Sequence, residues 1–500
     1  MKKITLIIIA VLMGLALNAQ ISVWDGTAER WTHGSGTEDD PYLIENAQQL
    51  AYIAEKTNED VYNGINYRTM YVDTCFLLTV DIDFGASSGL QWEPIGAAGN
   101  LSWKGKFGGH FDGGGHNMSN INLSYQNTSN FFGIFGMMEG GSLRNILVDG
   151  AEIHIFEAYA YTYGQSGLIL GYGSNVIVEN CINKADVVWD HISMDINGCV
   201  LGGLFGQLGN SIVSNCHNYG NIRVPNVELM HDGAYIGGLC GVLYECDIDN
   251  CSNLGDIYVQ SGDVYWGGIA ICGGIAGVMS GSMAYCFNTG DCDVSIVVEE
   301  TNNNIQSAGG LIGGVFTSTL AISNSYSASN IIMSGNNLPT YYGGIVGFVA
   351  DTVQVEVTDS YYLDNIASNN YGVPQSEAFM KTQDFVDLLN ANGDFYAMDI
   401  MNVNKGYPVF ERYYSVEETD FANEISVYPN PAKDVVNITF ANNAECRFID
   451  IYSIDGRLVE TFPETSQSST INIANLTPGL YLIKVRTNDG KEFTEKIVVK

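Results

Sequence analysis

GLFG, at Gly203–Gly206, is one copy of a tetrapeptide that recurs along the chain. Clear copies are GLCG at Gly238–Gly241, GIAG at Gly274–Gly277, GLIG at Gly310–Gly313 and GIVG at Gly344–Gly347, and looser ones begin at Gly133 (GIFG) and Gly167 (GLILG). Successive copies start 34, 36, 35, 36, 36 and 34 residues apart. So regular a period indicates one supersecondary unit stacked on itself as a solenoid.

A second signature follows four of these copies. It reads VENCINKADV from Val178, VSNCHNYGNI from Val213, IDNCSNLGDI from Ile248 and MAYCFNTGDC from Met283. The four copies align without gaps and give two columns of identical residues at steps of 35: Cys181, Cys216, Cys251 and Cys286, and Asn183, Asn218, Asn253 and Asn288. Short apolar runs broken by Asn and Gly predict strands with corners, not helices.

Strands stacked in this way form a parallel β-helix with about 4.8 Å between coils. We therefore predict an all-β fold: a right-handed parallel β-helix solenoid of about 35-residue repeats, with short capping helices and a small C-terminal immunoglobulin-like β-sandwich. An inward Asn at each corner would bond the turn backbone and the Asn of the next coil, because a buried amide needs partners. The Asn column is thus predicted to be a structural ladder.

Geometry argues against disulfides in the Cys column. The Cβ atoms of in-register neighbours stay near the strand spacing of about 4.8 Å, longer than the roughly 3.5–4.5 Å of a disulfide. Small buried thiols are the better interpretation. Pairing of Cys240 with Cys246 or Cys272 stays open, and the total of 11 is odd. Cys292 takes an apolar position of the repeat, and the other cysteines off the column are Cys75, Cys199, Cys240, Cys246, Cys272 and Cys446.

Composition limits the partners. A chain of 500 residues can bury a large core and form two or three domains. Its 21 basic and 56 acidic residues give a net charge of −35. Such a surface repels nucleic acid and anionic membranes, so we expect no nucleic-acid partner. The charge permits calcium binding; no other cofactor is expected.

Residues 1–20 have the pattern of a secretory signal peptide. Lys2 and Lys3 precede the apolar run Ile4–Leu17, and the segment closes with Ala19 and Gln20. No later stretch approaches the roughly 20 uninterrupted apolar residues of a membrane span. We expect export through the periplasm to the cell surface or the medium, without a transmembrane anchor.

Residues 21–130 are predicted to form an N-terminal cap and the start of the β-helix. Ala47, Leu50, Ala51 and Ala54 have helical spacing within residues 45–57. Because the open end of a solenoid needs a cover, this short helix is the predicted cover.

Four motifs in this region precede the repeats of residues 131–365: GT-x-x-x-PYLI at Gly36–Ile44, LT-x-DID at Leu78–Asp83, W-x-PIG at Trp92–Gly96 and F-x-G-x-FDG-x-GH at Phe107–His116. Their order resembles the GLUG-motif family of secreted bacterial proteins. The resemblance implies an adhesin-like surface β-helix. GLUG motifs also occur beside peptidases that cleave immunoglobulin A, but none of the seven histidines begins the HExxH motif of such a zinc enzyme.

Residues 366–410 are predicted to close the C-terminal end of the solenoid. Phe379, Phe385 and Leu389 suit an amphipathic helix ended by Asn392 and Gly393. Residues 411–423 read as a polar, acidic linker. In residues 424–500, short strands separated by Asp-Gly and Pro-Gly turns predict a small β-sandwich.

The last segment carries several ordered motifs: Tyr428-Pro429-Asn430-Pro431, Asp455-Gly456, Pro478-Gly479 with Tyr481, and a terminal stretch from Lys496 to Lys500. These resemble the type A C-terminal sorting domain of the type IX secretion system of Bacteroidetes. The resemblance implies that residues 424–500 bind the type IX translocon and are removed by a sortase-like protease at the cell surface.

Four carboxylates near the N-terminus are weak candidates for a site: Asp81, Asp83, Glu93 and Asp112. Asp81 and Asp83 share one face of a strand. A single cleft holding two carboxyls roughly 5–9 Å apart would fit a glycoside hydrolase. A calcium site and plain cap architecture are the other interpretations.

No nucleophile, base and orienting group cluster in the sequence, so we expect a binding or scaffold protein and no enzyme. Its ligand would be a surface glycan or a host or matrix component. Candidate sugar-stacking rings are Tyr159, Tyr161, Tyr163, Tyr265, Trp266, Tyr341 and Tyr342. A polysaccharide-active glycoside hydrolase and an acidic, calcium-stabilised surface layer are the alternative hypotheses.

Overall fold

The structure of the chain is a computed structural model. It describes residues 21–59, 68–97, 105–123, 131–150, 153–157, 164–191, 199–227, 233–261, 269–296, 305–335, 340–366, 369, 371–411, 425–429, 432–440, 446–453, 458–463, 468–477, 479–487 and 492–500. The predicted signal peptide and residues 412–423 of the predicted linker lie outside these ranges. The chain divides into two compact units, Met1–Phe379 and Met380–Lys500.

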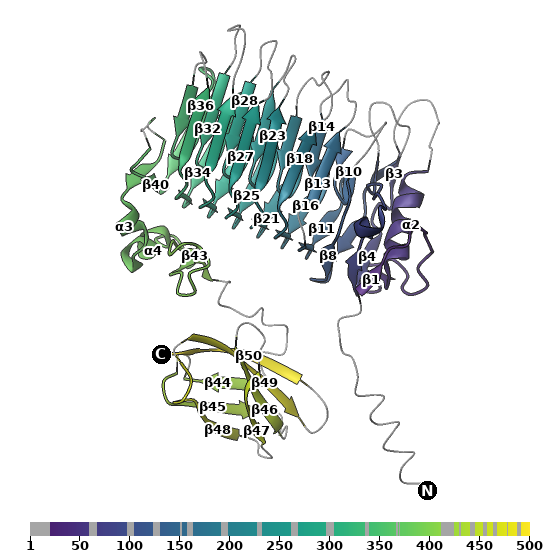
Figure 1. Cartoon of the computed structure of the whole chain (residues 1–500), viewed down its shortest axis with the longest axis vertical. Helices are drawn as coiled ribbons and strands as arrows, with labels where there is room; N and C mark the ends of the chain where they lie inside the picture. Colours follow the sequence, from purple (N-terminus) through teal and green to yellow (C-terminus); the bar gives the residue numbers. More distant parts are fainter. Residues whose placement is uncertain are drawn as a thin grey trace. The chain divides into compact units, whose positions relative to one another are not determined.

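The first unit is a β-solenoid in which each strand pairs in parallel with its equivalent in the next coil (Figure 1). An eleven-stranded sheet has the order β1 (Ile21–Val23), β5 (Asp81–Asp83), β8 (Asn117–Ser119), β12 (Leu147–Val148), β17 (Ile182–Asn183), β22 (His217–Asn218), β26 (Ser252–Asn253), β30 (Phe287–Asn288), β35 (Tyr326–Ser327), β40 (Tyr361–Leu363) and β41 (Val373–Gln375). The register links Asn183 to Asn218 and Asn218 to Asn253, which confirms the predicted 35-residue coil.

Three further sheets complete the walls. The largest, of seventeen strands, holds β2 (Tyr42–Ile44), β3 (Thr69–Met70), β4 (Cys75–Leu78), β6 (Lys106–Phe107), β7 (His110–Asp112), β10 (Phe135–Glu139), β11 (Ser142–Arg144), β15 (Leu170–Ser174), β16 (Ile177–Glu179), β20 (Phe205–Gly209), β21 (Ile212–Ser214), β25 (Cys240–Asp249), β29 (Ala276–Ala284), β33 (Ile312–Val315), β34 (Leu320–Ser323), β38 (Val346–Val349) and β39 (Val355–Thr358). Six strands form the next: β13 (Ile153–Glu157), β18 (Val187–His191), β23 (Ile222–Val227), β27 (Ile257–Ser261), β31 (Cys292–Ile296) and β36 (Ile331–Gly335). Seven form the last: β9 (Phe131–Phe132), β14 (Gly164–Gly167), β19 (Cys199–Gly202), β24 (Ala234–Gly237), β28 (Ile269–Gly273), β32 (Ile305–Gly309) and β37 (Thr340–Gly343).

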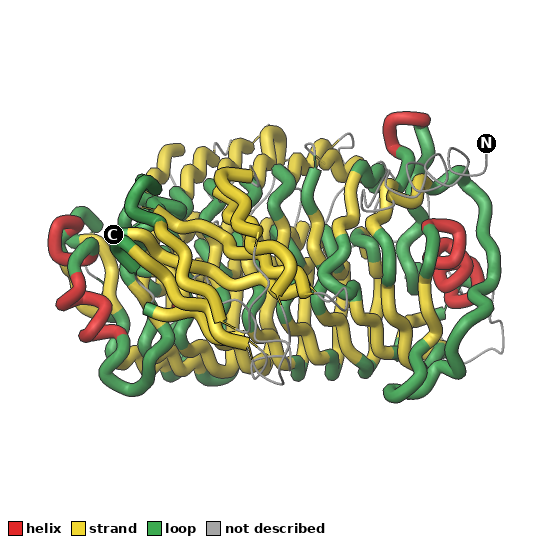
Figure 2. Tube along the Cα trace, turned by 90° about the horizontal axis from the view of Figure 1, so that it is seen from below, coloured by secondary structure: helices red, strands yellow, loops and turns green. Residues whose placement is uncertain are grey.

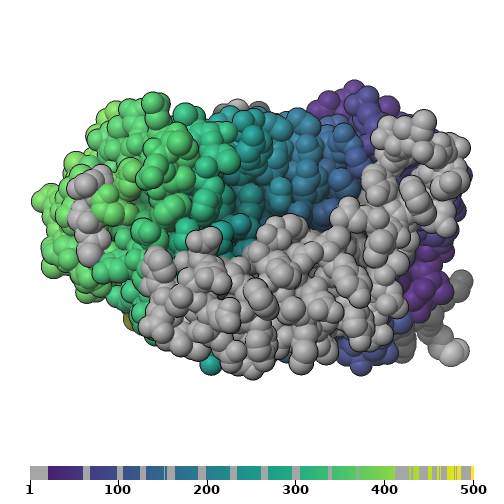
Figure 3. All heavy atoms as spheres, turned by 90° about the horizontal axis from the view of Figure 1, so that it is seen from above, coloured from purple at the N-terminus to yellow at the C-terminus, as the bar shows by residue number. Residues whose placement is uncertain are grey.

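Inward side chains of these sheets form one continuous apolar core along the solenoid. The predicted apolar column is part of it, because Val178, Val213, Ile248 and Met283 are buried and paired in register. Successive coils follow one another in chain order when the molecule is seen as spheres (Figure 3). Burial of whole rows of apolar side chains is the main source of stability in such a stack.

The Asn column forms the predicted ladder. Nδ2 of each Asn donates to Oδ1 of the next, at 2.8 Å from Asn183 to Asn218, 2.7 Å from Asn218 to Asn253 and 2.9 Å from Asn253 to Asn288. The same nitrogen also donates to a backbone carbonyl two residues on, as Asn218 does to Gly220 at 2.8 Å. All four Asn side chains are fully buried, and these hydrogen bonds offset the cost of burying an amide.

The first glycine of three GLFG-type motifs, Gly203, Gly238 and Gly274, leaves room for this ladder. A Cβ on Gly203 would stand 2.8 Å from Cγ of Asn218, and Gly238 and Gly274 meet Asn253 and Asn288 in the same way. In the coil after Asn288, Ser327 takes the place of the ladder Asn, and Gly310 faces this serine. In these coils, the glycine of the first signature therefore packs against the Asn of the second signature at the same corner.

The Cys column consists of buried free thiols. Cys240, Cys246 and Cys272 are also free, so the pairing that the sequence left open is not formed. Of the described cysteine side chains, all but Cys75 are buried. The column continues as serine: the Cys286 N–H donates to Oγ of Ser325 at 3.0 Å.

A third column, of Asn residues in the left-handed backbone region, was not predicted. The residue before each column cysteine has a positive φ: 56° at Asn180, 53° at Asn215, 51° at Asn250 and 51° at Tyr285. Asn tolerates this conformation better than other residues with a Cβ, because its short polar side chain bonds locally. The Asn of each Asn-Cys pair thus makes the turn.

The predicted N-terminal helix exists as α2 (Ala47–Thr57), at the N-terminal end of the solenoid (Figures 1 and 2). It begins after Asn46, whose side chain accepts the Gln49 N–H at 2.8 Å and caps the helix. Its buried residues Ala47, Leu50 and Ile53 join the solenoid core. A single 3₁₀ turn, η1 (Ala86–Ser88), follows β5 in the chain.

The helix predicted through Phe379 and Leu389 is broken in two. It comprises α3 (Glu377–Met380) and α4 (Gln383–Leu389), because the Thr382 side chain accepts the Phe385 N–H and starts a new helix. Helix α4 ends at Leu389, before the predicted stop at Asn392 and Gly393. A short antiparallel pair follows, β42 (Tyr396–Ala397) and β43 (Val409–Phe410). Closure of the solenoid by residues 366–410 stays a prediction.

The rest of the second unit contains two antiparallel sheets. One has the order β44 (Ile425–Tyr428), β45 (Val435–Phe440) and β48 (Ser468–Asn472), and the other β47 (Leu458–Pro463), β46 (Cys446–Ser453), β49 (Gly479–Thr487) and β50 (Glu492–Val499). Side chains of both sheets share one core, with Ile438 and Ile471 from the first and Ile451 and Ile483 from the second. This is the small β-sandwich that the sequence predicted.

Candidate functional site

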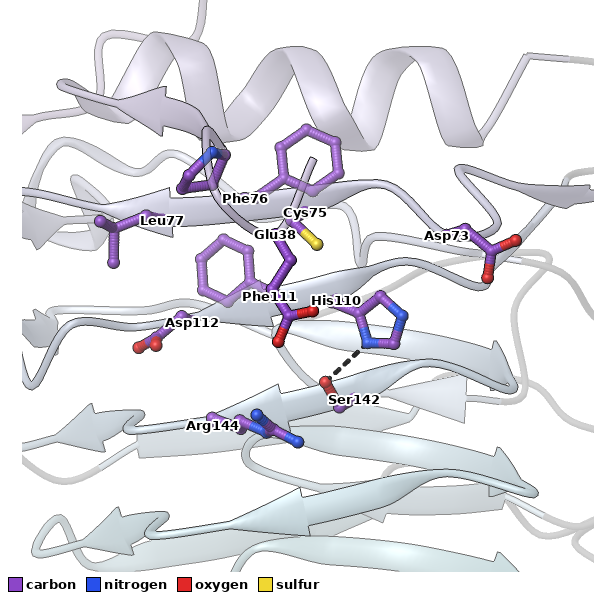
Figure 4. A pocket seen from close by; sticks show the side chains of 11 residues that line it. Glu38, Asp73, Cys75, Phe76, Leu77, His110, Phe111, Asp112, Ser142 and Arg144 are labelled. Atoms are coloured by element: carbon purple, nitrogen blue, oxygen red, sulfur yellow. Dashed lines mark hydrogen bonds between the residues drawn. The ribbon is translucent and has the colours of Figure 1, made fainter. Parts of the chain in front are cut away.

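A recess of about 500 Å³ lies on the outer face of strands β4, β7 and β11 (Figure 4). Side chains alternate between the two faces of a strand, so every second residue of these strands points outward into it. The register forms two rows: Cys75, His110 and Ser142 in one, and Leu77, Asp112 and Arg144 in the other. Glu38, Pro41 and Asp73 from the preceding loops complete the lining.

The outward groups combine acceptors with donors. One oxygen of Asp112 accepts the Gly114 N–H at 2.8 Å and the Asn145 amide at 2.9 Å, which fixes the carboxylate. Nε of Arg144 lies 3.0 Å from a Glu179 carboxylate oxygen. Figure 4 shows the Glu38 carboxylate reaching over this strand face from the opposite wall. A hydroxyl-rich ligand would find both kinds of partner here.

His110 and Ser142 resemble a catalytic dyad, since His110 Nδ1 lies 2.9 Å from Ser142 Oγ. The same arrangement recurs deep in the solenoid, where His217 Nδ1 lies 3.0 Å from Ser252 Oγ. Both pairs are register neighbours on adjacent strands. Stacking of equivalent residues therefore explains the contact without a catalytic role.

Cys75 is not an activated nucleophile. Burial and the negative charges of Glu38 and Asp73 raise the pKa of its thiol, while Arg144 acts in the opposite direction. Reactive cysteines have a lowered pKa and a positive environment. The thiol form therefore prevails in the recess at neutral pH.

Of the four acids proposed from the sequence, only Asp112 lines this recess; Asp81, Asp83 and Glu93 are not among its lining residues. Asp81 accepts hydrogen bonds from His116 Nδ1 at 3.1 Å and the Asn117 N–H at 3.0 Å. Asp83 accepts the Gly85 N–H at 2.7 Å and the Asn120 amide at 2.8 Å. These contacts give Asp81 and Asp83 architectural roles.

Sequence reasoning missed Glu38, Asp73 and Arg144. Glu38 belongs to the GT-x-x-x-PYLI motif, which could have signalled it. Among the described residues, no group of three or more His, Cys, Asp or Glu side chains is placed to hold a metal ion. The calcium hypothesis thus stays a prediction without a location. Tyr341 and Tyr342 are exposed; the other proposed stacking rings lie outside the described residues.

Several of the predicted motif residues of the last segment hold the sandwich together. The Tyr481 hydroxyl donates to the Thr477 carbonyl at 2.9 Å, and the Lys500 N–H donates to the Ala432 carbonyl at 2.8 Å. Tyr428 ends β44 and is exposed, and a cis peptide bond joins it to Pro429. Gly479 begins β49 and Lys496 lies in β50. Asn430, Pro431, Asp455, Gly456 and Pro478 lie outside the described residues.

Comparison with protein families identifies this segment. Residues 426–500 match the secretion system C-terminal sorting domain. The chain ends in a secretion sorting domain. Residues 232–258 match the GLUG motif, and they contain the GLCG copy and the Asn253 corner. The sorting domain marks the chain for export to the cell surface or the medium by the secretion machinery.

Two curated proteins align with part of the chain. A protein named as a Gly-rich membrane protein, from Evansella cellulosilytica, is 32% identical over 162 residues, which are 32% of this chain and 17% of that protein. Halomucin from Haloquadratum walsbyi is 26% identical over 189 residues, 34% of this chain and 2% of halomucin. The matched region thus spans a small part of either relative. Within the described residues, no helix is both long and apolar enough to cross a membrane.

Proposed function

We propose that this protein is an adhesin-like binding protein, exported through a signal peptide and the type IX route and displayed at the cell surface. The recess beside β4, β7 and β11 is its ligand-binding surface. The observation that carries this proposal is the presence, in one chain, of a sorting domain and of a solenoid whose N-terminal part brings Arg144, Asp112 and Glu38 into one recess of about 500 Å³. Binding sites combine such a concave shape with a few fixed polar groups.

The export step is tested by deleting residues 425–500 and treating intact cells with a protease. The full-length protein should be cut at the surface, and the shortened protein should be protected inside the cell. Equal surface exposure of both proteins would contradict the sorting route. Immunoblotting of periplasmic and surface fractions gives the readout.

Binding is tested on a glycan and matrix-protein array with the purified protein. Arg144→Ala should reduce the signal of any bound ligand at least tenfold, since a lost charged contact is worth about 1.5–3 kcal/mol. Arg223→Ala is the matched control, because Arg223 also carries an ion pair, to Asp186 at 2.9 Å, but lies on the solenoid wall. An equal loss of ligand binding in Arg144→Ala and Arg223→Ala would argue against the recess as the binding site.

A glycoside hydrolase is the second candidate. Glu38 and Asp112 share the recess, and glycoside hydrolysis requires two carboxyl groups. Release of reducing ends from a bound glycan, abolished by Asp112→Asn and by Glu38→Gln, would favour this reaction over simple binding. Binding without turnover would favour the adhesin-like role.

A further inference from the structure

A second cavity, of about 350 Å³, lies in the same cap. Segments 35–42 and 70–77 contribute residues both to it and to the recess. Its distinguishing feature is a set of aromatic side chains, Trp31, Tyr42, Tyr52 and Tyr71. Hydroxyl groups of Ser35 and Thr74 and the charged residues Arg30, Lys56 and Glu59 complete it.

The rings are packed against one another in a fixed arrangement. The Trp31 ring centroid lies 5.0 Å from that of Tyr42 and 5.3 Å from that of Tyr52, and Phe76 supports it from the core at 5.2 Å. Trp31 is buried, whereas the tyrosines are half-buried. These ring contacts fix the aromatic side chains in place at the cavity, which lowers the entropy cost of ordering them on binding.

The indole N–H of Trp31 is buried and has no hydrogen-bond partner among the residues that the structure describes. The other described tryptophans of the cap, buried Trp92 and half-buried Trp24, have a bonded indole N–H. Nε1 of Trp92 donates to the Ile134 carbonyl at 3.0 Å, and Nε1 of Trp24 donates to the Thr27 carbonyl at 2.9 Å. Trp31 lines the cavity, and an acceptor oxygen of a bound ligand would satisfy this donor.

The backbone around the cavity is shaped to hold the rings. Tyr71 has φ of +60°, a left-handed conformation that costs a bulky residue free energy. At Gly36, with φ of +83°, an added Cβ would meet the Tyr42 ring. The glycine and tyrosine of the GT-x-x-x-PYLI motif therefore fit together, and they do so at this cavity.

Charge selects among possible ligands. Lys56 is held by Glu55 at 3.0 Å and also by Glu59, and its ammonium lies 5.3 Å from the Tyr52 ring centroid. Arg30 is exposed and makes no ion pair with any described residue. Because Glu55 and Glu59 neutralise Lys56, Arg30 is the cation left to pair with a ligand, and a single carboxylate on that ligand would be attracted to it.

We propose that this cavity binds one pyranose unit of an acidic glycan, of the uronic acid class. The C–H face of the sugar lies on the tyrosine rings, whose faces are electron-rich, a sugar oxygen accepts the Trp31 N–H, and the carboxylate lies toward Arg30. This inference deepens the proposed binding function and rests on it, because it adds a second subsite to the same cap.

The test uses isothermal titration of the purified protein with a galacturonic acid trisaccharide and with a neutral galactose trisaccharide. The acidic sugar should bind, and Trp31→Phe, which keeps an aromatic ring but removes the N–H, should weaken it about tenfold. Trp189→Phe, in the solenoid core, is the matched control and should bind as the unmodified protein does. Thermal melting establishes that each variant is folded.

Arg30→Gln gives a test that does not depend on the core. This exposed residue should be replaceable without loss of folding, and the variant should lose the preference for the acidic over the neutral sugar. Unchanged binding in both Trp31→Phe and Arg30→Gln would overturn the second subsite, and the recess would survive if Arg144→Ala still weakened binding. If neither trisaccharide binds, the inference is overturned. The proposed function would still stand if a ligand found on the glycan and matrix-protein array bound more weakly to Arg144→Ala.

Discussion

The Asn218 side chain fills the space that a side chain on residue 203 would need, with Asn218 Cγ 2.8 Å from the position of a Cβ on Gly203. The two residues belong to the same coil but to different repeated signatures. Asn218 also hydrogen-bonds to Asn183 and Asn253 in the two adjacent coils. A side chain at position 203 would therefore disturb the Asn ladder in this coil. The glycine is therefore needed for packing and not for chain flexibility.

Gly203→Ala should lower the stability of the solenoid by about 1–3 kcal/mol, because the methyl group overpacks a corner that is already filled. Urea denaturation followed by circular dichroism measures the change. Gly209→Ala is the matched control, since its Cβ would meet no atom closer than 4.0 Å. Its effect should be much smaller.

A double variant tests the physical cause. In Gly203→Ala with Asn218→Ala, the contact with the amide is removed and only the contact with the Gly238 carbonyl oxygen, at 2.4 Å, remains. The two single losses should therefore add to more than the loss measured for the pair. Strict additivity would show that the glycine acts through its own backbone and not through Asn218.

Asn253→Ala should destabilise the protein more than Asn253→Ser. Asn253 is fully buried, accepts from Asn218 and donates to Asn288 and to the Gly255 carbonyl. Alanine leaves these partners unpaired, at roughly 1–3 kcal/mol for each buried group. Serine, which occupies the column at Ser327, can satisfy one of them. Thermal melting ranks the two variants, and equal melting temperatures would contradict the ladder's contribution.

Cys75 should react slowly with iodoacetamide at neutral pH, and the rate should rise as the pH passes the raised pKa of its thiol. Glu38 raises this pKa, so Glu38→Gln should increase the thiolate fraction and speed the reaction. Arg144 lowers the pKa, so Arg144→Gln should slow it. Mass spectrometry resolved by site separates Cys75 from the buried cysteines. The same sign of change in both variants would contradict this electrostatic account.

Tyr285→Asn should stabilise the protein by about 1 kcal/mol, because Asn accepts the left-handed region at lower cost. Tyr285 has φ of +51°, where the equivalent coils place Asn215 and Asn250. Tyr285→Ala is the control: it removes the ring without making the backbone conformation easier, so it should lower stability. A lower melting temperature for the Asn variant would show that ring packing outweighs backbone strain here.

The repeated coils were predictable because each position is seen several times in the sequence. Four copies fixed the 35-residue register and the Asn and Cys columns. Asn180, Asn215 and Asn250 were visible in the same signature, yet their role in the turn was missed. A repeated residue type does not by itself show that the backbone has a positive φ angle there. The link between Gly203 and Asn218 needed the path of the chain around one coil.

The recess was not predictable in this way. It joins Cys75, His110 and Ser142, which stand 35 and 32 residues apart in register, so no constant period aligns them. Glu38 and Asp73 come from loops that occur once. The candidates Asp81 and Asp83 were conspicuous for their alternation, but neighbouring N–H groups and amides already occupy them.

The ladder from Asn183 to Asn288 joins coils whose upper and lower faces are chemically equivalent. Removing or duplicating one such coil would bring together surfaces that already fit, whereas the cap and the coils beyond Asn288, where Gly310 accepts the last amide bond at 2.9 Å, offer no such match. The gene can therefore gain or lose single repeats within this stretch, and each event would change the reach of the rod by about 4.8 Å. The number of coils can therefore change while the N-terminal recess stays the same.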